Sequence, residues 1–486
     1  MKKQALLALA TIGAASLQAQ EQNPNIVLIY MDDLGYGDLT ITGAQGYATP
    51  HIDRIAQEGL MLTQYYAPSP VSSASRAGLL TGCYPNRVSV FSVFMPNSTT
   101  GISSEEKLIP EMLKEQGYAT SCIGKWHLGH YKEFLPLRHG FDEYFGLPYS
   151  NDMWPAGTGA RFGEESPAVQ KPEFPLLPLI RGEETLEVIS NLDQMGDLTK
   201  RYTEQAVDFI TRNAESHTPF FLYFAHTMPH VPLACSAEFR GKSEHGLFGD
   251  VLMEIDWSVG QVVETLKKLG IEHNTILIFT SDNGPWQVFG THAGSTGGLR
   301  EAKLTSFEGG QRVPCFIKWP DVIRPGSISN SLVNGVDFLP TFAEITNGKL
   351  PDKKIDGISM LPIWKGDLDT KTREYMFYYF SDNQLNGVRD AQFKLIEPFD
   401  YNSYEDVLPG LDGAKGKMSK KSTGWALYDL RRDPGERYNV IEQYPEVVER
   451  LKSQLDRMRA DVGDSNMGVK GAGVRPVGKL ESTGTR

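Results

Sequence analysis

The chain has 486 residues and a formal net charge of −12, with 60 acidic and 48 basic residues. This length is too great for one ordinary hydrophobic core, so we expect a large α/β domain and a second, smaller unit. The acidic balance argues against a general nucleic-acid binder, and an anionic substrate would require a local cluster of cations. No apolar run is long enough to span a bilayer.

The first residues have the pattern of a secretory signal peptide. Lys2 and Lys3 precede a short apolar stretch, and small residues around Ala19 offer a cleavage site. We therefore assign residues 1–20 to a signal peptide and expect an exported protein, periplasmic or secreted. An exported protein could form one or two disulfides, but we expect ordinary buried thiols at the four cysteines. They are widely spaced and match no metal pattern: Cys83, Cys122, Cys235 and Cys315.

Three nearly continuous apolar runs predict strands that are buried on both faces, at residues 25–33, 220–230 and 274–284. Helical patterns at residues 198–214 and 250–270 lie between them. This alternation predicts an α/β fold, in which helices flank a large, mostly parallel central sheet. We assign residues 21–365 to this domain.

The pattern changes over residues 366–486. Residues 374–396 and 424–440 predict strands joined by turns, and residues 444–462 predict an amphipathic helix. Its apolar stripe consists of Val447, Val448, Leu451, Leu455 and Met458. We expect a smaller α+β domain, with an antiparallel sheet and a helix.

Two of the apolar runs end in polar pairs, Asp32 with Asp33 and Asp282 with Asn283. Each pair alone is typical of a turn, because Asp and Asn favour turns. Ligands of open α/β sheets bind beyond the carboxyl ends of the strands, where these pairs would bring three carboxylates and one amide together. At about 4 Å and an effective dielectric near 20, two carboxylates repel by roughly 4 kcal/mol. A shared hard cation, Ca²⁺ or Mg²⁺ rather than zinc, would relieve this repulsion, because every donor is oxygen.

Residues 69–87, SPVSSASRAGLLTGCYPNR, place small hydroxyl residues directly before an arginine. One interpretation is structural, since Ser is a good N-cap for a helix. The other is catalytic, with Ser72 as a nucleophile near the positive end of a helix that begins near Ser75, and Arg76 one turn on.

Candidate cationic and acid–base residues lie in three further segments. CIGKWHLGH places Lys125 and His127 two residues apart, so their side chains would face the same way in an extended segment. HTMPHVP offers His226 and His230, and Lys303 precedes a Gly-rich turn in LREAKLTSFEGGQRVP. Taken one at a time, each would usually be a surface lysine or a core histidine whose hydrogen bonds are satisfied. Their joint occurrence beside buried strand ends favours an anion-binding site.

The segment Ser72-Ser73-Ala74-Ser75-Arg76, followed by AGLLTG, resembles the formylglycine motif of type I sulfatases. These arylsulfatase A-like and carbohydrate sulfatases belong to the alkaline phosphatase-like superfamily. DDLGYGD, GKWHLG, PHVP, SDNG and LREAK…EGG also match family segments, in the family's order, over nearly the whole mature chain. The sequence departs from the motif with Ser in place of Cys and Ala in place of Pro. Both variants occur among bacterial sulfatases, so the resemblance implies a Ser-type, anaerobic maturating enzyme as a partner.

The resemblance implies that Ser72 is oxidised to formylglycine, whose aldehyde hydrates to a geminal diol. One hydroxyl would attack sulfur in line and displace the sugar alcohol. The second hydroxyl would then lose its proton, so that sulfate is expelled and the aldehyde regenerates. An unmodified serine would leave a stable sulfate ester, with no second hydroxyl to eject it.

The resemblance also implies the roles of the matching residues. Arg76, Lys125 and Lys303 would hold the sulfate oxygens and the nucleophile, with roughly 1.5–3 kcal/mol from each charge-assisted bond. His127 would deprotonate the second hydroxyl, and His230 would protonate the leaving alcohol. The cation, most simply Ca²⁺ with Mg²⁺ as the alternative, would bind to Asp32, Asp33, Ser72, Asp282 and Asn283.

Residues 147–157, LPYSNDMWPAG, combine aromatic, amide and carboxylate groups that suit a sugar, although an ordinary surface loop has the same composition. The segment resembles one in arylsulfatase A-like and galactosamine-sulfatase-like enzymes. We therefore expect Asn151 and Asp152 to bind a galactose or N-acetylgalactosamine sulfate, in an exo-acting carbohydrate sulfatase. His292 and Asn386 are further candidates for this pocket.

Two alternative functions remain open at this point. A phosphomonoester or phosphonate hydrolase of the same superfamily would usually need more zinc ligands than this oxygen-rich set provides. A non-catalytic protein that binds sulfated glycans would not need both histidines.

Overall fold

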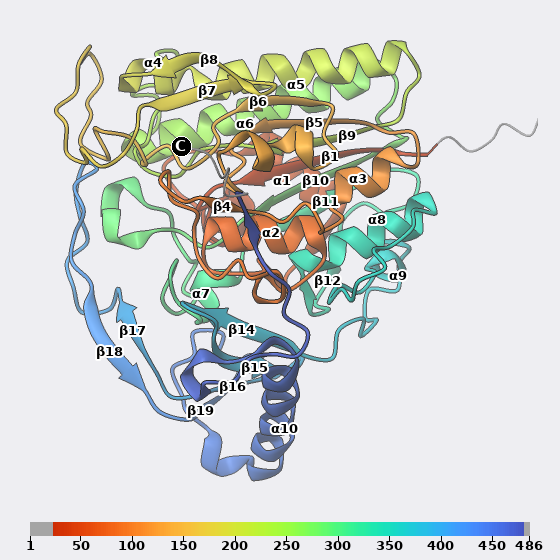
Figure 1. Ribbon diagram of the computed structural model, residues 1–486, viewed down its shortest axis with the longest axis vertical. Coiled ribbons are helices and arrows are strands. Elements are labelled where there is room, and N and C mark those ends of the chain that lie inside the picture. Colours follow the sequence, from red (N-terminus) through yellow and green to blue (C-terminus); the bar gives the residue numbers. More distant parts are fainter. Residues whose placement is uncertain (1–22, 481–486) are drawn as a thin grey trace, which may run out of the picture.

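The computed structural model describes residues 23–480. The predicted signal peptide, residues 1–20, lies outside them. A ten-stranded sheet occupies the larger part of the chain (Figure 1), in the order β12-β2-β11-β10-β1-β9-β5-β6-β7-β8. From β12 to β8 the strands are Ser327–Ser329, Leu60–Leu62, Cys315–Lys318, Thr275–Ser281, Asn25–Met31, Phe220–Ala225, Ala119–Gly124, Glu143–Gly146, Leu177–Arg181 and Glu184–Ile189.

The five central strands, β10, β1, β9, β5 and β6, run parallel, which confirms the predicted α/β architecture. Antiparallel pairs flank this centre, β11 with β10 and with β2 on one side, and β7 with β6 and with β8 on the other. The three apolar runs of the sequence form β1, β9 and β10, which are buried throughout. Their polar ends lie in the loops that follow.

Helices cover both faces of the sheet, so each central strand is apolar on both sides. On β1, Val27 and Ile29 pack with one set of helices, whereas Ile26 and Leu28 pack with the other. The first set consists of α1 (Pro50–Gln57), α5 (Leu198–Glu215) and α6 (Gly246–Lys268). The second consists of α2 (Ser72–Thr81), α3 (Ile109–Lys114), α8 (Phe338–Thr346) and α9 (Leu361–Trp364). The helices predicted at 198–214 and 250–270 are therefore α5 and α6.

The C-terminal part of the chain forms the predicted antiparallel sheet and helix, beside the large sheet (Figure 1). The sheet has the order β14-β15-β16-β19, with strands Met376–Phe380, Gln384–Arg389, Phe393–Ile396 and Ala426–Asp429. Helix α10 (Pro445–Val462) buries the predicted stripe against this sheet. Helix α9 ends at Trp364 and β14 begins at Met376. The residues between them do not define a single boundary, so the domain boundary at residue 365 stays a prediction.

Smaller strands pair within each unit, and one pair joins the two units. Strand β17 (Phe399–Ser403) pairs with β18 (Ser419–Thr423), and β3 (Tyr65–Tyr66) pairs with β13 (Val333–Asn334). The last strand, β20 (Gly478–Lys479), returns to pair with β4 (Thr100–Gly101) in the first unit. Two further short helices are α4 (Leu192–Gly196) and α7 (Glu308–Gln311).

The structure bears on the cysteines and on membrane-spanning helices. All four cysteines are buried free thiols, as predicted. Within residues 23–480, every helix is too short or too polar to cross a membrane.

A histidine beside the sheet lacks polar partners. His139 is fully buried, and its ring stacks on Trp126 with the ring centroids 6.1 Å apart. Neither of its ring nitrogens has a hydrogen-bond partner among the described residues. Burial lowers the pKa of His139 from 6.5 to about 4, because the interior does not solvate the imidazolium.

The His139→Phe variant should tolerate acid better than the parent protein. The unfolded chain takes up a proton at this histidine near pH 6.5, but the native chain does so only near pH 4. Between these values the group costs the native state roughly 1.4 kcal/mol per pH unit, a cost that the variant lacks. We expect the difference in unfolding free energy between variant and parent, from urea titrations, to grow in the variant's favour as the pH falls from 6.5 to 4.5. A difference that does not change with pH would contradict this prediction.

The control for this experiment is His273→Phe. His273 is exposed, and its pair with Asp321 raises its pKa. Its contribution to stability is therefore present at acid pH and lost as the pH rises, so the control should show the opposite trend.

Candidate active site

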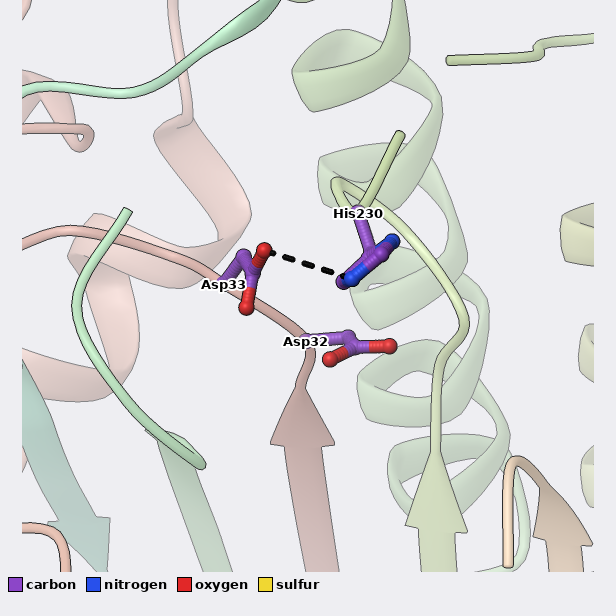
Figure 2. Close-up of side chains that lie close together, drawn as sticks. All are labelled: Asp32, Asp33 and His230. Atoms are coloured by element: carbon purple, nitrogen blue, oxygen red, sulfur yellow. Dashed lines mark ion pairs between the residues drawn. The ribbon is translucent and has the colours of Figure 1, made fainter. Parts of the chain in front are cut away.

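The two predicted carboxylate pairs lie together because β1 and β10 are parallel neighbours. Met31 is in register with Ser281, so both chains leave the sheet at the same edge. The backbone N–H of Asp33 donates to Asp282 Oδ1 at 3.1 Å, and Asn283 Nδ2 donates to Asp33 Oδ1 at 2.7 Å. Figure 2 shows Asp32 and Asp33 at the end of β1, with Asp33 directed toward His230.

Each of the three carboxylates is paired with a cation from a different segment. Lys125 Nζ lies 2.6 Å from Asp32 Oδ2, and Lys303 Nζ lies 2.7 Å from Asp33 Oδ1. The guanidinium of Arg76 donates from Nη2 to Asp282 Oδ2 at 2.9 Å and from Nε to the same atom at 3.2 Å. All these side chains are buried, none more than 6% exposed. We call these six residues the charged cluster: Asp32, Asp33, Arg76, Lys125, Asp282 and Lys303.

The pKa values within the cluster follow from burial and charge. Burial alone would raise the pKa of Asp32, but the nearby cations, Lys125 foremost, outweigh it and lower that pKa. Burial and the charge of Asp32 raise the pKa of Asp282 despite Arg76. Burial lowers the pKa of Lys125, whereas the carboxylates around Lys303 outweigh its burial and raise its pKa. The cluster therefore holds buried charge only because each ion has a partner.

Ser72 lies in the middle of this cluster. Its Oγ donates to Asp32 Oδ1 at 3.1 Å and accepts from Lys125 Nζ at 3.3 Å, and Asn283 Oδ1 lies 3.5 Å away. The side chain is 1% exposed and does not cap the helix. Helix α2 begins at Ser72 and not near Ser75, because Val71 is the extended N-cap residue and its carbonyl accepts from Ser75 N. Ser72 therefore occupies the first turn, which strengthens the positive potential at its hydroxyl.

Lys125 and His127 do not lie in the extended segment that the sequence predicted. Strand β5 ends at Gly124, and the φ of 60° at His127 is not that of an extended chain. His127 Nε2 lies 3.1 Å from the carbonyl oxygen of Phe94, and its Nδ1 has no hydrogen-bond partner within residues 23–480. Burial, and then the charges of Lys125 and the other cations, hold the pKa of His127 well below its ordinary value. His127 is therefore neutral and able to accept a proton.

His230 faces the cluster from the loop after β9. Its Nδ1 donates to the carbonyl of Val231 at 2.6 Å, so the other ring nitrogen, Nε2, points toward Asp33 Oδ2, 3.6 Å away (Figure 2). His226, from the same segment, lies elsewhere. Its Nε2 contacts Ser258 Oγ at 3.4 Å, and burial lowers its pKa to about 3.

The four candidate sugar-binding residues fall into two groups. Asn151 donates to the carbonyls of His230 and Pro232 at 3.3 and 3.1 Å. Asp152 pairs with Lys171 at 3.3 Å; burial would raise its pKa, but His230 and Lys171 outweigh burial and lower it. These two residues therefore border the cluster.

The other two sugar candidates contact different parts of the molecule. His292 lines a small cavity of about 190 Å³ with Arg161, Leu233 and Asp412. Asn386, on β15, donates to Ser306 Oγ at 2.9 Å. No hydrogen bond or ion pair in the described chain links either residue to the charged cluster.

Four residues that the sequence analysis did not single out also contact the site. Ser150 Oγ lies 3.4 Å from Lys125 Nζ, and Tyr223 OH lies 3.4 Å from Arg76 Nη1. The ring of Trp286 lies 4.6 Å from Lys303 Nζ, and Tyr404 OH donates to the Lys303 carbonyl at 2.7 Å. Ser150 lies inside the quoted segment 147–157, and Trp286 lies two residues after SDNG, so both had a usable local signal. Tyr223, inside a strand, and Tyr404, in the second unit, have no local signal.

The donor set fits a hard divalent cation. Asp32, Asp33 and His230 each offer one ligand atom, and these atoms lie within 4.8 Å of one another. Asp282 and Asn283 add oxygen donors at the same edge, so oxygens dominate, as Ca²⁺ and Mg²⁺ require. Three carboxylates balance three cations in the cluster, so a divalent cation and a divalent anion could enter together without net charge.

A family model described as Sulfatase matches residues 24–348. The chain belongs to the sulfatase family. A second model, the C-terminal part of N-sulphoglucosamine sulphohydrolase, matches residues 302–408 of this sulfatase. Two curated relatives are N-acetylgalactosamine-6-sulfatase of Mus musculus and arylsulfatase A of Homo sapiens. Each is 35% identical, and the alignments cover 92% and 90% of this chain and 88% of either relative.

Solved structures agree with this assignment. The PsFucS1 sulfatase from Pseudoalteromonas has a TM-score of 0.80 and 25% identity, over 90% of this chain and 91% of its own. A Bacteroides thetaiotaomicron sulfatase from work on glycosaminoglycan metabolism has a TM-score of 0.75 and 32% identity, over 90% and 100%. A phosphonate monoester hydrolase from Silicibacter pomeroyi shares the fold at 18% identity and a TM-score of 0.62. The protein is therefore a sulfuric ester hydrolase with an alkaline phosphatase-like fold.

Arg76→Lys should lower kcat/KM for a sulfate ester about 10- to 100-fold. The variant keeps the charge but loses the planar group that contacts both Asp282 and the Lys125 carbonyl. Such charge-assisted bonds contribute roughly 1.5–3 kcal/mol. Steady-state kinetics on an aryl sulfate measures the effect, with Arg54→Lys at an exposed position of α1 as the control. Equal activity of the two variants would show that the geometry of Arg76 does not matter.

Proposed function

We propose that this sulfatase is an exo-acting carbohydrate sulfatase. Its substrate would be a galactose or N-acetylgalactosamine sulfate at the end of a glycan, its nucleophile a formylglycine made from Ser72, and its metal Ca²⁺. The observation that carries the proposal is the environment of Ser72, which is buried between Asp32 and Lys125 in the first turn of α2. Relatives named N-acetylgalactosamine-6-sulfatase support the choice of sugar.

An unmodified serine would form a stable sulfate ester and stop after one reaction. The proposed modification of Ser72 would allow the enzyme to turn over. A hydrated aldehyde at residue 72 supplies one hydroxyl that attacks sulfur and a second whose deprotonation releases sulfate. Lys125 lies 3.3 Å from the Ser72 oxygen and stabilises negative charge on it. Arg76, Lys125 and Lys303 then hold the anionic oxygens of the sulfate. The conversion of a serine also calls for a maturating enzyme of the Ser type as a partner.

The two histidines suit the two proton transfers. His127 stays neutral because burial and its cationic neighbours lower its pKa, so it takes the proton of the second hydroxyl. His230 keeps its Nδ1 proton on the Val231 carbonyl, and its Nε2 faces the cluster. That nitrogen is placed to protonate the oxygen of the departing sugar.

The metal would be held by Asp32, Asp33, Asp282, Asn283 and residue 72. Ca²⁺ supplies a Lewis acid that lowers the pKa of the nucleophile and neutralises sulfate charge. Asn151 and Asp152 border the same cluster and would bind the sugar hydroxyls. His292 and Asn386, which contact other segments, stay weaker candidates for that role. The signal peptide predicted at residues 1–20 supports an exported location, periplasmic or secreted, which fits a substrate outside the cell.

The first test is the mass of the tryptic peptide from Ile55 to Arg76, in protein from its native host. We expect a peptide lighter by two hydrogens than the encoded sequence, as an aldehyde at residue 72 requires. Ser72→Ala should abolish both the mass change and turnover, whereas Ser73→Ala, at a variable position of the motif, should keep them. An unmodified peptide in every active molecule would overturn the proposed nucleophile. Phosphate release faster than sulfate release would favour the phosphohydrolase alternative.

A second test concerns the metal and does not depend on activity. Ca²⁺ at 100 times its Kd should stabilise the native state by about 2.7 kcal/mol, because only the folded chain assembles the donors. Urea unfolding with and without Ca²⁺, after treatment with a chelator, measures this gain. Asn283→Leu removes one oxygen donor and should reduce it. Equal stabilisation of parent and variant would exclude Asn283 as a ligand.

A further inference from the structure

We propose that a cavity beside the charged cluster binds an anionic group on the sugar next to the one that carries the scissile sulfate. The proposal rests on the function proposed above and extends it to the neighbouring sugar. The cavity has a volume of about 500 Å³ and lies between η5 (Gln287–His292) and the segment 404–417. That segment joins β17 to β18 and rises from the C-terminal unit toward the loops of the first unit (Figure 1).

Backbone hydrogen bonds hold the two walls of this cavity together. Gly410 N and Gly416 N both donate to the carbonyl of Val288, at 3.0 and 2.8 Å, and Asp412 N donates to Thr291 Oγ1 at 2.8 Å. At Gly413, φ is 81°, and a Cβ would lie 3.2 Å from His292 Nδ1. The segment is therefore a fixed wall that requires glycine where it meets η5.

Two aromatic residues connect the cavity to the catalytic residues. Tyr404 lines the cavity, and its hydroxyl donates to the Lys303 carbonyl at 2.7 Å. Gln287, at the other wall, directly follows Trp286, whose ring lies 5.6 Å from the His230 ring and 4.6 Å from Lys303 Nζ. A sugar bound in the cavity would therefore be a neighbour of the sugar whose sulfate meets Lys303 and His230.

The charge of the cavity selects an anion. Lys417 lines it, and Lys415 Nζ lies 5.6 Å from the Trp286 ring centroid. Within residues 23–480, neither lysine forms an ion pair with a carboxylate, whereas the nearby Lys421 pairs with Glu405 and Asp406. One cation in the lining and a second beside Trp286, each without an ion pair among the described residues, are notable in a chain of net charge −12. They would attract a carboxylate or sulfate on the substrate and would do so less at high salt.

The rest of the lining suits the face of a sugar ring. Val288, Val407, Pro409 and Leu411 supply apolar surface, and Leu411 is 65% exposed at the rim. A mainly apolar cavity of this size with a few polar groups is typical of a small-ligand site. The occupant that fits both the lining and the charge is therefore an acidic sugar, either a uronate or a second sulfated residue.

The test compares substrates that share the same sulfated terminal sugar. One is the monosaccharide, and three are disaccharides whose second sugar is a neutral hexose, a uronate or a sulfated hexose. We expect the parent enzyme to prefer the acidic disaccharides over the neutral one by about tenfold in kcat/KM, in line with one or two partly exposed charge contacts. The uronate and sulfate substrates distinguish the two sources of the anion.

The variant is Lys415→Ala/Lys417→Ala, and the control is Lys420→Ala, an exposed lysine on β18 that does not line the cavity. The double variant should lose the preference for acidic disaccharides and keep the kcat/KM of the monosaccharide within about twofold. The control should keep both. A preference that survives in the double variant, or an equal loss on all four substrates, would overturn the proposal.

A binding measurement separates this proposal from the proposed function. Calorimetry on Ser72→Ala protein with the desulfated uronate disaccharide requires no turnover. Binding that is lost with Lys415→Ala/Lys417→Ala supports the cavity even if the monosaccharide sulfate is not hydrolysed. Turnover of the monosaccharide without any binding of the acidic disaccharide would overturn the cavity and leave the proposed function intact.

Discussion

The structure depends on the neutralisation of three buried carboxylates by three buried cations. Asp32, Asp33 and Asp282 come from the loops that follow β1 and β10, whereas Arg76, Lys125 and Lys303 come from a helix and two other loops. Removing one partner of a buried ion pair typically costs about 3–5 kcal/mol, because the remaining charge has neither water nor a counter-ion. Every loop at this edge of the sheet is therefore constrained by the others, and Ser72 is held where their charges meet.

The C-terminal unit contributes to this constraint through the segment that carries Lys303. Glu308, five residues further on, is fully buried, and Lys394 of β16 lies 3.2 Å from it and 2.8 Å from Glu436. Burial would raise the pKa of Glu308, but Lys394 and two arginines outweigh it and lower that pKa to about 2. The backbone N–H of Glu308 donates to Glu436 at 2.7 Å. The second unit therefore holds the loop that carries Lys303 in place and supplies a wall of the adjacent cavity.

Residues near the C-terminus also hold a loop that borders the site. Strand β20 pairs with β4, and Arg475 forms two hydrogen bonds of 2.8 Å with Glu106. The loop before β4 contains Phe94, whose carbonyl contacts His127 and whose N–H donates to Ser73. His127 and the first turn of α2 thus contact one loop, and this loop leads into β4, the strand that pairs with β20.

The sequence by itself determined three central strands, the long helices α5, α6 and α10, and all six residues of the charged cluster. Runs such as residues 25–33 are apolar throughout, and a motif such as SSASR combines residue types at fixed spacing, so both are local properties of the chain. It did not reveal Tyr223 or Tyr404, the turn at His127, or the separation of His226, His292 and Asn386 from the cluster. Only the tertiary structure decided these, because each depends on which segments pack together across hundreds of residues, and no local pattern of residues encodes that choice.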